Sequence, residues 1–136
     1  GMQPQFIEAR DPDEFAKAFS DMTRARAGAL TVLPSAMFLR EHRRLVDLAA
    51  KNRLPAVYTS REFVDAGGLM SYGASISDAL QQAGRYAARI IKGEKPGDLP
   101  VVQSVKFDFM INLKTAKTLG LQFHPQLLAT VDEVIE

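Results

Sequence analysis

The stretch that decides the fold covers residues 53–73 and reads RLPAVYTSREFVDAGGLMSYG. Its first apolar segment, residues 56–58, has the composition of a short buried strand and runs directly into polar residues. A glycine pair then marks a turn before a second short strand, residues 69–71, and Tyr72 follows this strand. Parallel α/β sheets bind ligands at the carboxyl ends of their strands. The two polar strand ends therefore predict a site at one edge of such a sheet.

Strands and helices alternate in the part of the chain that precedes this stretch. Residues 6–9 are a strand candidate, and residues 11–14 (DPDE) supply the capping residue, the proline and the glutamate of a helix start. Residues 29–33 form a continuous apolar run, which predicts a strand buried on both faces. Residues 37–52 are predicted to be one helix. This β-α-β-α-β order with short connections predicts a parallel sheet.

The second half of the chain begins with a long amphipathic helix, predicted at residues 75–92. Ser75 precedes it, Gly93 follows it as a C-terminal cap residue, and the apolar positions between them fall on one stripe. Beyond it we expect extended segments at 101–103 and 106–112, a helix at 113–119, a helical turn at 125–128 and a last strand at 132–135. The chain as a whole predicts an α/β fold with three layers: a mostly parallel sheet with helices on both faces.

Composition narrows the class of protein. A chain of 136 residues fits a single domain with one core. Seventeen Lys and Arg against 16 Asp and Glu give a net charge of +1, which argues against a nucleic-acid partner bound to a broad cationic face. The chain has no cysteine, so disulfides and thiolate metal sites are excluded.

Motifs for catalysis are absent from the sequence. No serine lies in a Gly-x-Ser-x-Gly setting, and His42 and His124 lack metal-ligand spacing to each other or to a carboxylate cluster. The pair Gly67-Gly68 has neither a third glycine nor a following Lys-Ser/Thr, so it does not predict a phosphate loop. We therefore predict no catalytic residue, no metal and no cofactor.

A ligand-binding site needs fewer specialised residues than a catalytic site does. Polar groups at a concave edge of the sheet and an aromatic surface are sufficient. Arg61 has the geometry to hold a carboxylate, and the helix start at Ser75 favours an anion. Simpler explanations remain open: Ser60 and Ser75 suit plain helix caps, Arg61 and Glu62 suit an ion pair on the surface, and Tyr72 suits the core. The places that qualify are Ser35, residues 59–62, residues 71–73 and the amides that begin the helix at Ser75.

Several segments of the sequence also resemble a known protein family. Residues 54–58 (LPAVY), 60–73 (SREFVDAGGLMSYG), 91–101 (IKGEKPGDLPV), 111–117 (INLKTAK) and 132–136 (DEVIE) closely resemble the substrate-binding proteins of ABC transporters for tryptophan or tyrosine uptake. This resemblance implies a lobe of the type I periplasmic-binding-protein-like fold, an amino-acid-like ligand, an ABC permease as partner and no catalysis. It implies these cleft-facing residues: Ser35, Thr59, Ser60, Arg61, Ser71 and Tyr72.

Members of that family are about twice as long, with an export signal and two lobes. We therefore expect this chain to be the C-terminal half: one lobe over residues 2–136 with a crossover segment at about 104–136, and Gly1 as a remnant of cloning. The resemblance implies a periplasmic or membrane-associated location, whereas the lack of a signal after Met2 predicts a cytoplasmic one if Met2 is the native start. In a two-lobed member, the first lobe would cover apolar surface of this half. Without that lobe, we expect two copies of the chain to cover the surface by pairing as a homodimer.

Two other functions remain open from the sequence. The first is a dimeric cytoplasmic module without a signal, regulatory or vestigial, derived from a substrate-binding protein. The second is a small enzyme of flavodoxin-like shape, which is disfavoured because no acid-base pair follows the predicted strands.

Overall fold

A single mixed sheet organises the chain in the computed structural model, which describes residues 1, 3–103 and 105–136. The strand order is β1-β2-β3-β4-β5. The first three strands are parallel, β4 is antiparallel to β3, and β5 is parallel to β4. The strands are β1 (Leu30–Thr31), β2 (Ala56–Tyr58), β3 (Met70–Ala74), β4 (Phe107–Asn112) and β5 (Glu133–Ile135). The predicted α/β class, with parallel strands at the start of the sheet, is confirmed.

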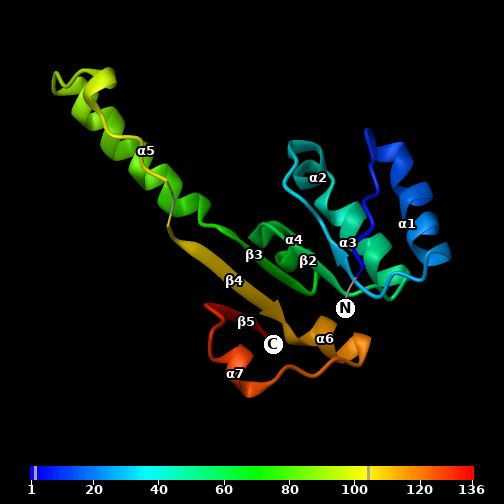
Figure 1. Cartoon of the computed structure of the whole chain (residues 1–136). Helices are drawn as coiled ribbons and strands as arrows, with labels where there is room; N and C mark the ends of the chain where they lie inside the picture. The colour runs from blue at the N-terminus through cyan, green and yellow to red at the C-terminus, as the bar shows by residue number, and fades with distance from the viewer. Residues whose placement is uncertain (2, 104) are drawn as a thin grey trace.

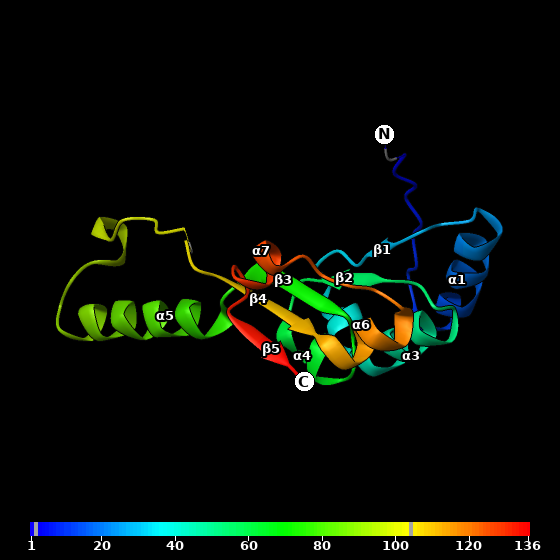
Figure 2. The same cartoon turned by 90° about the horizontal axis from the view of Figure 1, so that it is seen from below.

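Seven α-helices and two short 3-10 helices are assigned in the described residues. The α-helices are α1 (Phe15–Arg24), α2 (Ala36–Arg40), α3 (His42–Lys51), α4 (Arg61–Asp65), α5 (Ile76–Ile91), α6 (Leu113–Leu119) and α7 (Pro125–Leu128). The 3-10 helices are η1 (Pro12–Glu14) and η2 (Pro96–Asp98). Figures 1 and 2 show α1 to α4 grouped with the parallel end of the sheet, while α5 leaves it.

The core lies between this helix group and the first strands. Phe15 and Phe19 of α1 pack with α3 and with the aromatic pair Tyr58 and Phe63, whose rings stack 4.5 Å apart. Ile111 of β4 is fully buried, as expected for a strand with neighbours on both sides. Asp11 begins η1 as predicted, since its carboxylate accepts hydrogen bonds from the amides of residues 13 and 14.

Several boundaries differ from those predicted, each for a local reason. Residues 6–9 form no strand: Phe6 is exposed, and β1 pairs only with β2. Because β1 is an edge strand, Thr31 is exposed and the prediction of burial on both faces was wrong. The predicted helix over residues 37–52 is broken at Glu41. There the His42 ring contacts the carbonyl oxygen of Leu39, an acceptor that a continuous helix would use itself.

The extended segment predicted at residues 101–103 is not a strand. By contrast, β3 is longer than predicted, because its second half pairs with β4 rather than with β2. The predicted domain begins at Met2 and its crossover segment at about residue 104; those two residues lie outside the described part of the chain.

The part of the molecule farthest from the core is an arm, which we define as residues 75–103. It consists of α5, the turn through η2 and the segment that returns toward β4, and both cartoon views show it projecting away from the sheet (Figures 1 and 2). No residue of α5 is buried, although its apolar stripe was predicted from the sequence. The apolar stripe is therefore exposed along its length.

Candidate functional site

Three strand ends converge at the carboxyl edge of the parallel strands. Ser35 follows β1, Thr59 and Ser60 follow β2, and Tyr72 lies in the half of β3 that extends past β2. Because β1, β2 and β3 are parallel neighbours, these residues share one edge of the sheet. The sequence-based prediction that this edge gathers polar and aromatic groups agrees with the topology.

Close approach of the backbone fixes the relation between β2 and β3 at this edge. A Cβ placed on Gly73 would lie 2.0 Å from the carbonyl oxygen of Thr59. Only glycine allows this approach, so the backbone of Thr59 lies directly against β3. Ser60 follows Thr59 directly, so it lies at the same end of β2 and precedes α4.

The side chain of Ser60 is the polar group of this edge that the fold does not use. Ser60 precedes α4 but its hydroxyl makes no capping hydrogen bond, so the simpler explanation of a plain helix cap does not hold. The Ser60 Oγ is buried and has no hydrogen-bond partner among the described residues. A buried hydroxyl left unpaired costs about 1–3 kcal/mol.

Three aromatic side chains of β3 and β4 form a surface, which we name the aromatic wall: Tyr72, Phe107 and Phe109. Tyr72 stacks on Phe107 with ring centroids 5.4 Å apart and meets Phe109 edge to face at 5.9 Å. Tyr72 is 55% exposed and Phe107 46% exposed, so the wall faces outward. Tyr72 is thus not a core residue.

The two phenylalanines were missed as site residues. The alternation of Phe107, Phe109 and Ile111 was visible in the sequence, but their place next to Tyr72 depends on the antiparallel pairing of β4 with β3. That pairing sets Tyr72 opposite Phe109 and Ala74 opposite Phe107. A period of two predicts a strand but does not say which neighbour the strand takes.

Arg61 is engaged by two carboxylates of the chain itself. Its guanidinium donates two hydrogen bonds to Glu133 of β5, at 2.7 and 3.0 Å, and one to Asp65 at 3.0 Å. The hydrogen bonds to Glu133 first, and those to Asp65 second, raise the pKa of Arg61 above its ordinary value. The alternative in which Arg61 pairs with Glu62 is not what the structure shows. A ligand carboxylate would have to compete with Glu133 for this side chain.

The remaining predicted positions are less suited to direct contact. Ser71 is buried at 2% exposure within β3, whereas Ser35 is exposed before α2 and makes no capping hydrogen bond. The amide of Ser75 donates to the carbonyl oxygen of Lys106 and is not available to an anion. The structure therefore places Ser35, Thr59, Ser60 and Tyr72 at one edge of the sheet and separates Ser71 by burial.

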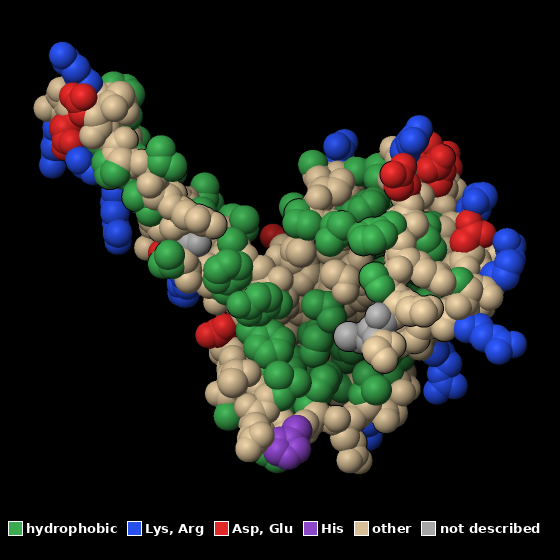
Figure 3. All heavy atoms as spheres, in the orientation of Figure 1, with side chains coloured by type: hydrophobic (Ala, Val, Ile, Leu, Met, Phe, Trp, Pro, Cys, Tyr) green, Lys and Arg blue, Asp and Glu red, His purple; other side chains and the backbone are tan. Residues whose placement is uncertain are grey.

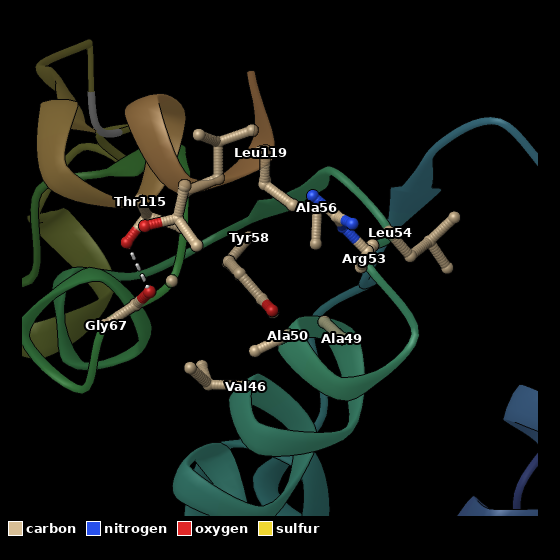
Figure 4. A pocket seen from close by; sticks show the side chains of 13 residues that line it. Val46, Ala49, Ala50, Arg53, Leu54, Ala56, Tyr58, Gly67, Thr115 and Leu119 are labelled. Atoms are coloured by element: carbon tan, nitrogen blue, oxygen red, sulfur yellow. Dashed lines mark hydrogen bonds between the residues drawn. The ribbon is translucent and has the colours of Figure 1, made fainter. Parts of the chain in front are cut away.

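A pocket of about 140 Å³ lies at the opposite, amino-terminal edge of the same strands. Figure 4 shows Tyr58 reaching from β2 toward Val46 and Ala50 of α3, with Thr115 of α6 donating to the Gly67 carbonyl oxygen at 2.8 Å. The pocket is smaller than the roughly 300–1,000 Å³ of ordinary ligand sites. The Tyr58 hydroxyl is buried without a hydrogen-bond partner in the described residues, and burial raises its pKa. We interpret this pocket as a packing defect.

Two further features concern the part of the chain that the structure describes. There, no group of three or more His, Asp or Glu side chains is placed to hold a metal ion. Within the same residues, no helix is both long and apolar enough to cross a membrane.

Comparison with known proteins identifies the family. The sequence pattern of the family described as ABC transporter substrate binding protein matches residues 5–135. The chain belongs to this family. A curated relative, the tyrosine-binding protein of Clostridioides difficile, is 28% identical over 75 residues, which are 55% of this chain and 22% of the relative.

Solved structures share the fold. The ABC domain from Streptococcus pneumonia in complex with L-Trp has a TM-score of 0.86 at 24% identity, and the match covers 96% of this chain and 44% of that chain. An open, ligand-free substrate binding protein with adhesive properties from Clostridium difficile has a TM-score of 0.64 at 21% identity. That match covers 90% of this chain and 41% of the other chain. This family member thus spans less than half the length of the solved structures that it matches.

Proposed function

We propose that this chain is the solute-binding component, or one lobe of such a component, of an ABC-type import system, and that it catalyses no reaction. Its ligand is an aromatic amino acid or a similar small carboxylate. The partner is an ABC permease, and the location is periplasmic or membrane-associated, as the family resemblance implies. Residues 2–136 correspond to one lobe, with a crossover segment over about 104–136, and two chains form a homodimer.

One observation carries the ligand class: an exposed aromatic wall at the end of the parallel strands where Thr59 and Ser60 also lie. The Ser60 Oγ has no partner in the described residues, and Tyr72 is 55% exposed. An aromatic ligand stacked on Tyr72 gains about 0.5–1.5 kcal/mol beyond the area that it buries. Its polar end then lies within reach of the strand edge that holds Thr59 and Ser60.

The relatives point to the same ligand class. One is named for tyrosine and one structure holds L-Trp, and both ligands combine an aromatic ring with an amino-acid group. Arg61 contributes to the site through its pairing with Glu133, which holds the start of α4 against β5. The ligand carboxylate takes Arg61 only where it displaces Glu133.

A thermal-shift screen tests this proposal. L-Tryptophan, L-tyrosine, L-phenylalanine and small aliphatic carboxylates are compared, and a ligand at a hundredfold excess over its Kd stabilises the folded chain by about 2.7 kcal/mol. We expect shifts for the aromatic amino acids that disappear in Tyr72→Ala and weaken in Ser60→Ala. Tyr86→Ala, which removes a tyrosine from the arm, is the matched control and leaves the shifts intact.

Two outcomes would reject the proposal. A flat response across the whole panel would favour the signal-less regulatory or vestigial module. Shifts that survive Tyr72→Ala would place the ligand elsewhere on the molecule.

A further inference from the structure

The pocket beside Tyr58 is a packing defect in the sense that the chain's own side chains leave it unfilled. Its walls come from α3, β2, α6 and the glycine pair that precedes β3. Exposed hydrophobic side chains follow α5 and continue over the body at its base (Figure 3), but no residue that lines the pocket belongs to α5. The pocket is therefore a feature of the folded body and not of the arm.

Small residues create the space inside this pocket. Three alanines and two glycines line it: Ala49, Ala50, Ala56, Gly67 and Gly68. Gly68 cannot be larger, because an added Cβ would lie 2.7 Å from the Tyr58 ring. The volume of about 140 Å³ is close to that of an engineered apolar cavity of about 150 Å³ that binds benzene. The pocket thus fits a benzene-sized molecule and cannot enclose an entire aromatic amino acid.

A buried hydroxyl in the pocket lacks a partner. Tyr58 is 1% exposed, and its hydroxyl has no hydrogen-bond partner in the described residues. Figure 4 shows this hydroxyl pointing from β2 toward Ala49 and Ala50, whose methyl groups form no hydrogen bond. The threonine hydroxyls of the lining are already used: Thr115 donates to the Gly67 carbonyl oxygen at 2.8 Å, and Thr118 to that of Lys114 at 3.0 Å. The Tyr58 hydroxyl is thus the buried group that a bound molecule can satisfy.

The walls of the pocket are preformed. The Tyr58 ring stacks on Phe63 with centroids 4.5 Å apart, which fixes the direction of the hydroxyl. The exposed members of the lining are Ala50, Arg53 and Thr118, so a small molecule reaches the pocket from solvent between α3 and α6. Because the site exists before a ligand enters, binding needs little reorganisation of the chain.

We propose that this pocket binds a neutral, benzene-sized molecule with one hydroxyl group, of which phenol is the simplest, and that the ligand hydroxyl bonds to the Tyr58 Oη. A phenolic oxygen both donates and accepts, so the ligand and Tyr58 take complementary roles. The ligand ring fills the space that the alanines and glycines leave. A charged group is disfavoured, because the buried lining offers it no counter-charge. This second site is independent of the amino-acid site proposed above.

Alanine methyl groups report on this site directly. The chain is labelled with 13C at its alanine methyl groups and titrated separately with phenol and with benzene, and the shifts are followed by NMR. The methyl signals of Ala49, Ala50 and Ala56 are expected to move, while those of the α5 alanines stay in place. Phenol is expected to bind about three- to tenfold more tightly than benzene, because it gains the hydrogen bond to Tyr58.

Substitutions separate the hydroxyl from the space around it. Tyr58→Phe keeps the ring and removes the hydroxyl, and is expected to erase the preference for phenol while benzene still binds. Ala50→Leu fills the pocket and is expected to abolish binding of both molecules. Ala88→Leu makes the same change on α5, outside the pocket, and is expected to leave both affinities as in wild type.

Three results would overturn the proposal. One is an absence of shifts at the pocket methyl groups up to the solubility limits of phenol and benzene. Another is binding of both molecules that survives Ala50→Leu, which would place them elsewhere. The third is a preference for phenol that persists in Tyr58→Phe, which would remove the hydroxyl from the site. Since these titrations contain no amino acid, failure here is distinguishable from failure of the proposed function.

Discussion

Replacement of Gly73 by alanine tests the packing on which the candidate site depends. The added Cβ would lie 2.0 Å from the Thr59 carbonyl oxygen and 2.9 Å from its carbonyl carbon, and real Cβ contacts do not fall under 3.0 Å. The two strand ends must therefore separate by about 1 Å. Overpacking of this kind costs about 1–3 kcal/mol, and each weakened strand-end hydrogen bond adds about 0.5–1.5 kcal/mol. We expect Gly73→Ala to lose roughly 2–4 kcal/mol of stability.

Urea unfolding followed by circular dichroism measures this loss as a lower midpoint with an unchanged slope. All samples are compared at one protein concentration, because association adds to apparent stability. Gly84→Ala is the matched control: nothing lies within 4 Å of its added Cβ, and alanine is favoured over glycine within a helix by about 1 kcal/mol. If Gly73→Ala unfolds within about 0.5 kcal/mol of wild type, the close approach of Thr59 to β3 is wrong.

Two further changes test other parts of the molecule. Tyr58→Phe removes a buried hydroxyl that has no partner in the described residues, and is expected to leave stability at neutral pH unchanged or to raise it by about 1 kcal/mol. Because burial raises the pKa of Tyr58, its contribution is complete below the unfolded pKa of about 10 and is lost as pH rises toward the folded pKa. Wild type should thus lose about 1.4 kcal/mol per pH unit more than Tyr58→Phe above pH ~10, and equal slopes in urea titrations would contradict the burial. Glu133→Gln is expected to change stability by less than about 1 kcal/mol, since its ion pair with Arg61 is half exposed, yet to tighten binding of a carboxylate ligand by freeing that arginine. Weaker binding, measured by calorimetry, would mean that Glu133 itself supports the ligand.

Much of the fold could be predicted from local signals. The end of α6 at Gly120, the proline start of α7 and the alternation in β4 follow from turn chemistry and periodicity, and each element is found where these signals place it. Errors arose where the outcome depended on neighbours. Residues 6–9 have strand-like composition but no strand beside them, and the sequence of α3 does not reveal that His42 interrupts the preceding helix.

The location of the candidate site could be predicted better than the residues that form it. The carboxyl edge follows from the order of elements, but the use of Arg61 by Glu133, a residue 72 positions later, depends on tertiary pairing. The burial of Ser71 and the position of Phe107 beside Tyr72 depend on where β4 joins the sheet. Such long-range pairings are not encoded in the spacing of any one segment.

The most direct test of the proposed function uses the absence of tryptophan from this chain. The fluorescence of added L-tryptophan, excited beyond the tyrosine absorption band, is then free of protein background. We predict a saturable rise in its anisotropy as wild-type chain is added. Excess L-tyrosine should reverse this rise, and the Tyr72→Ala chain should not produce it. Anisotropy that stays at the value of the free amino acid up to millimolar protein would contradict the proposal that this edge of the sheet binds an aromatic amino acid.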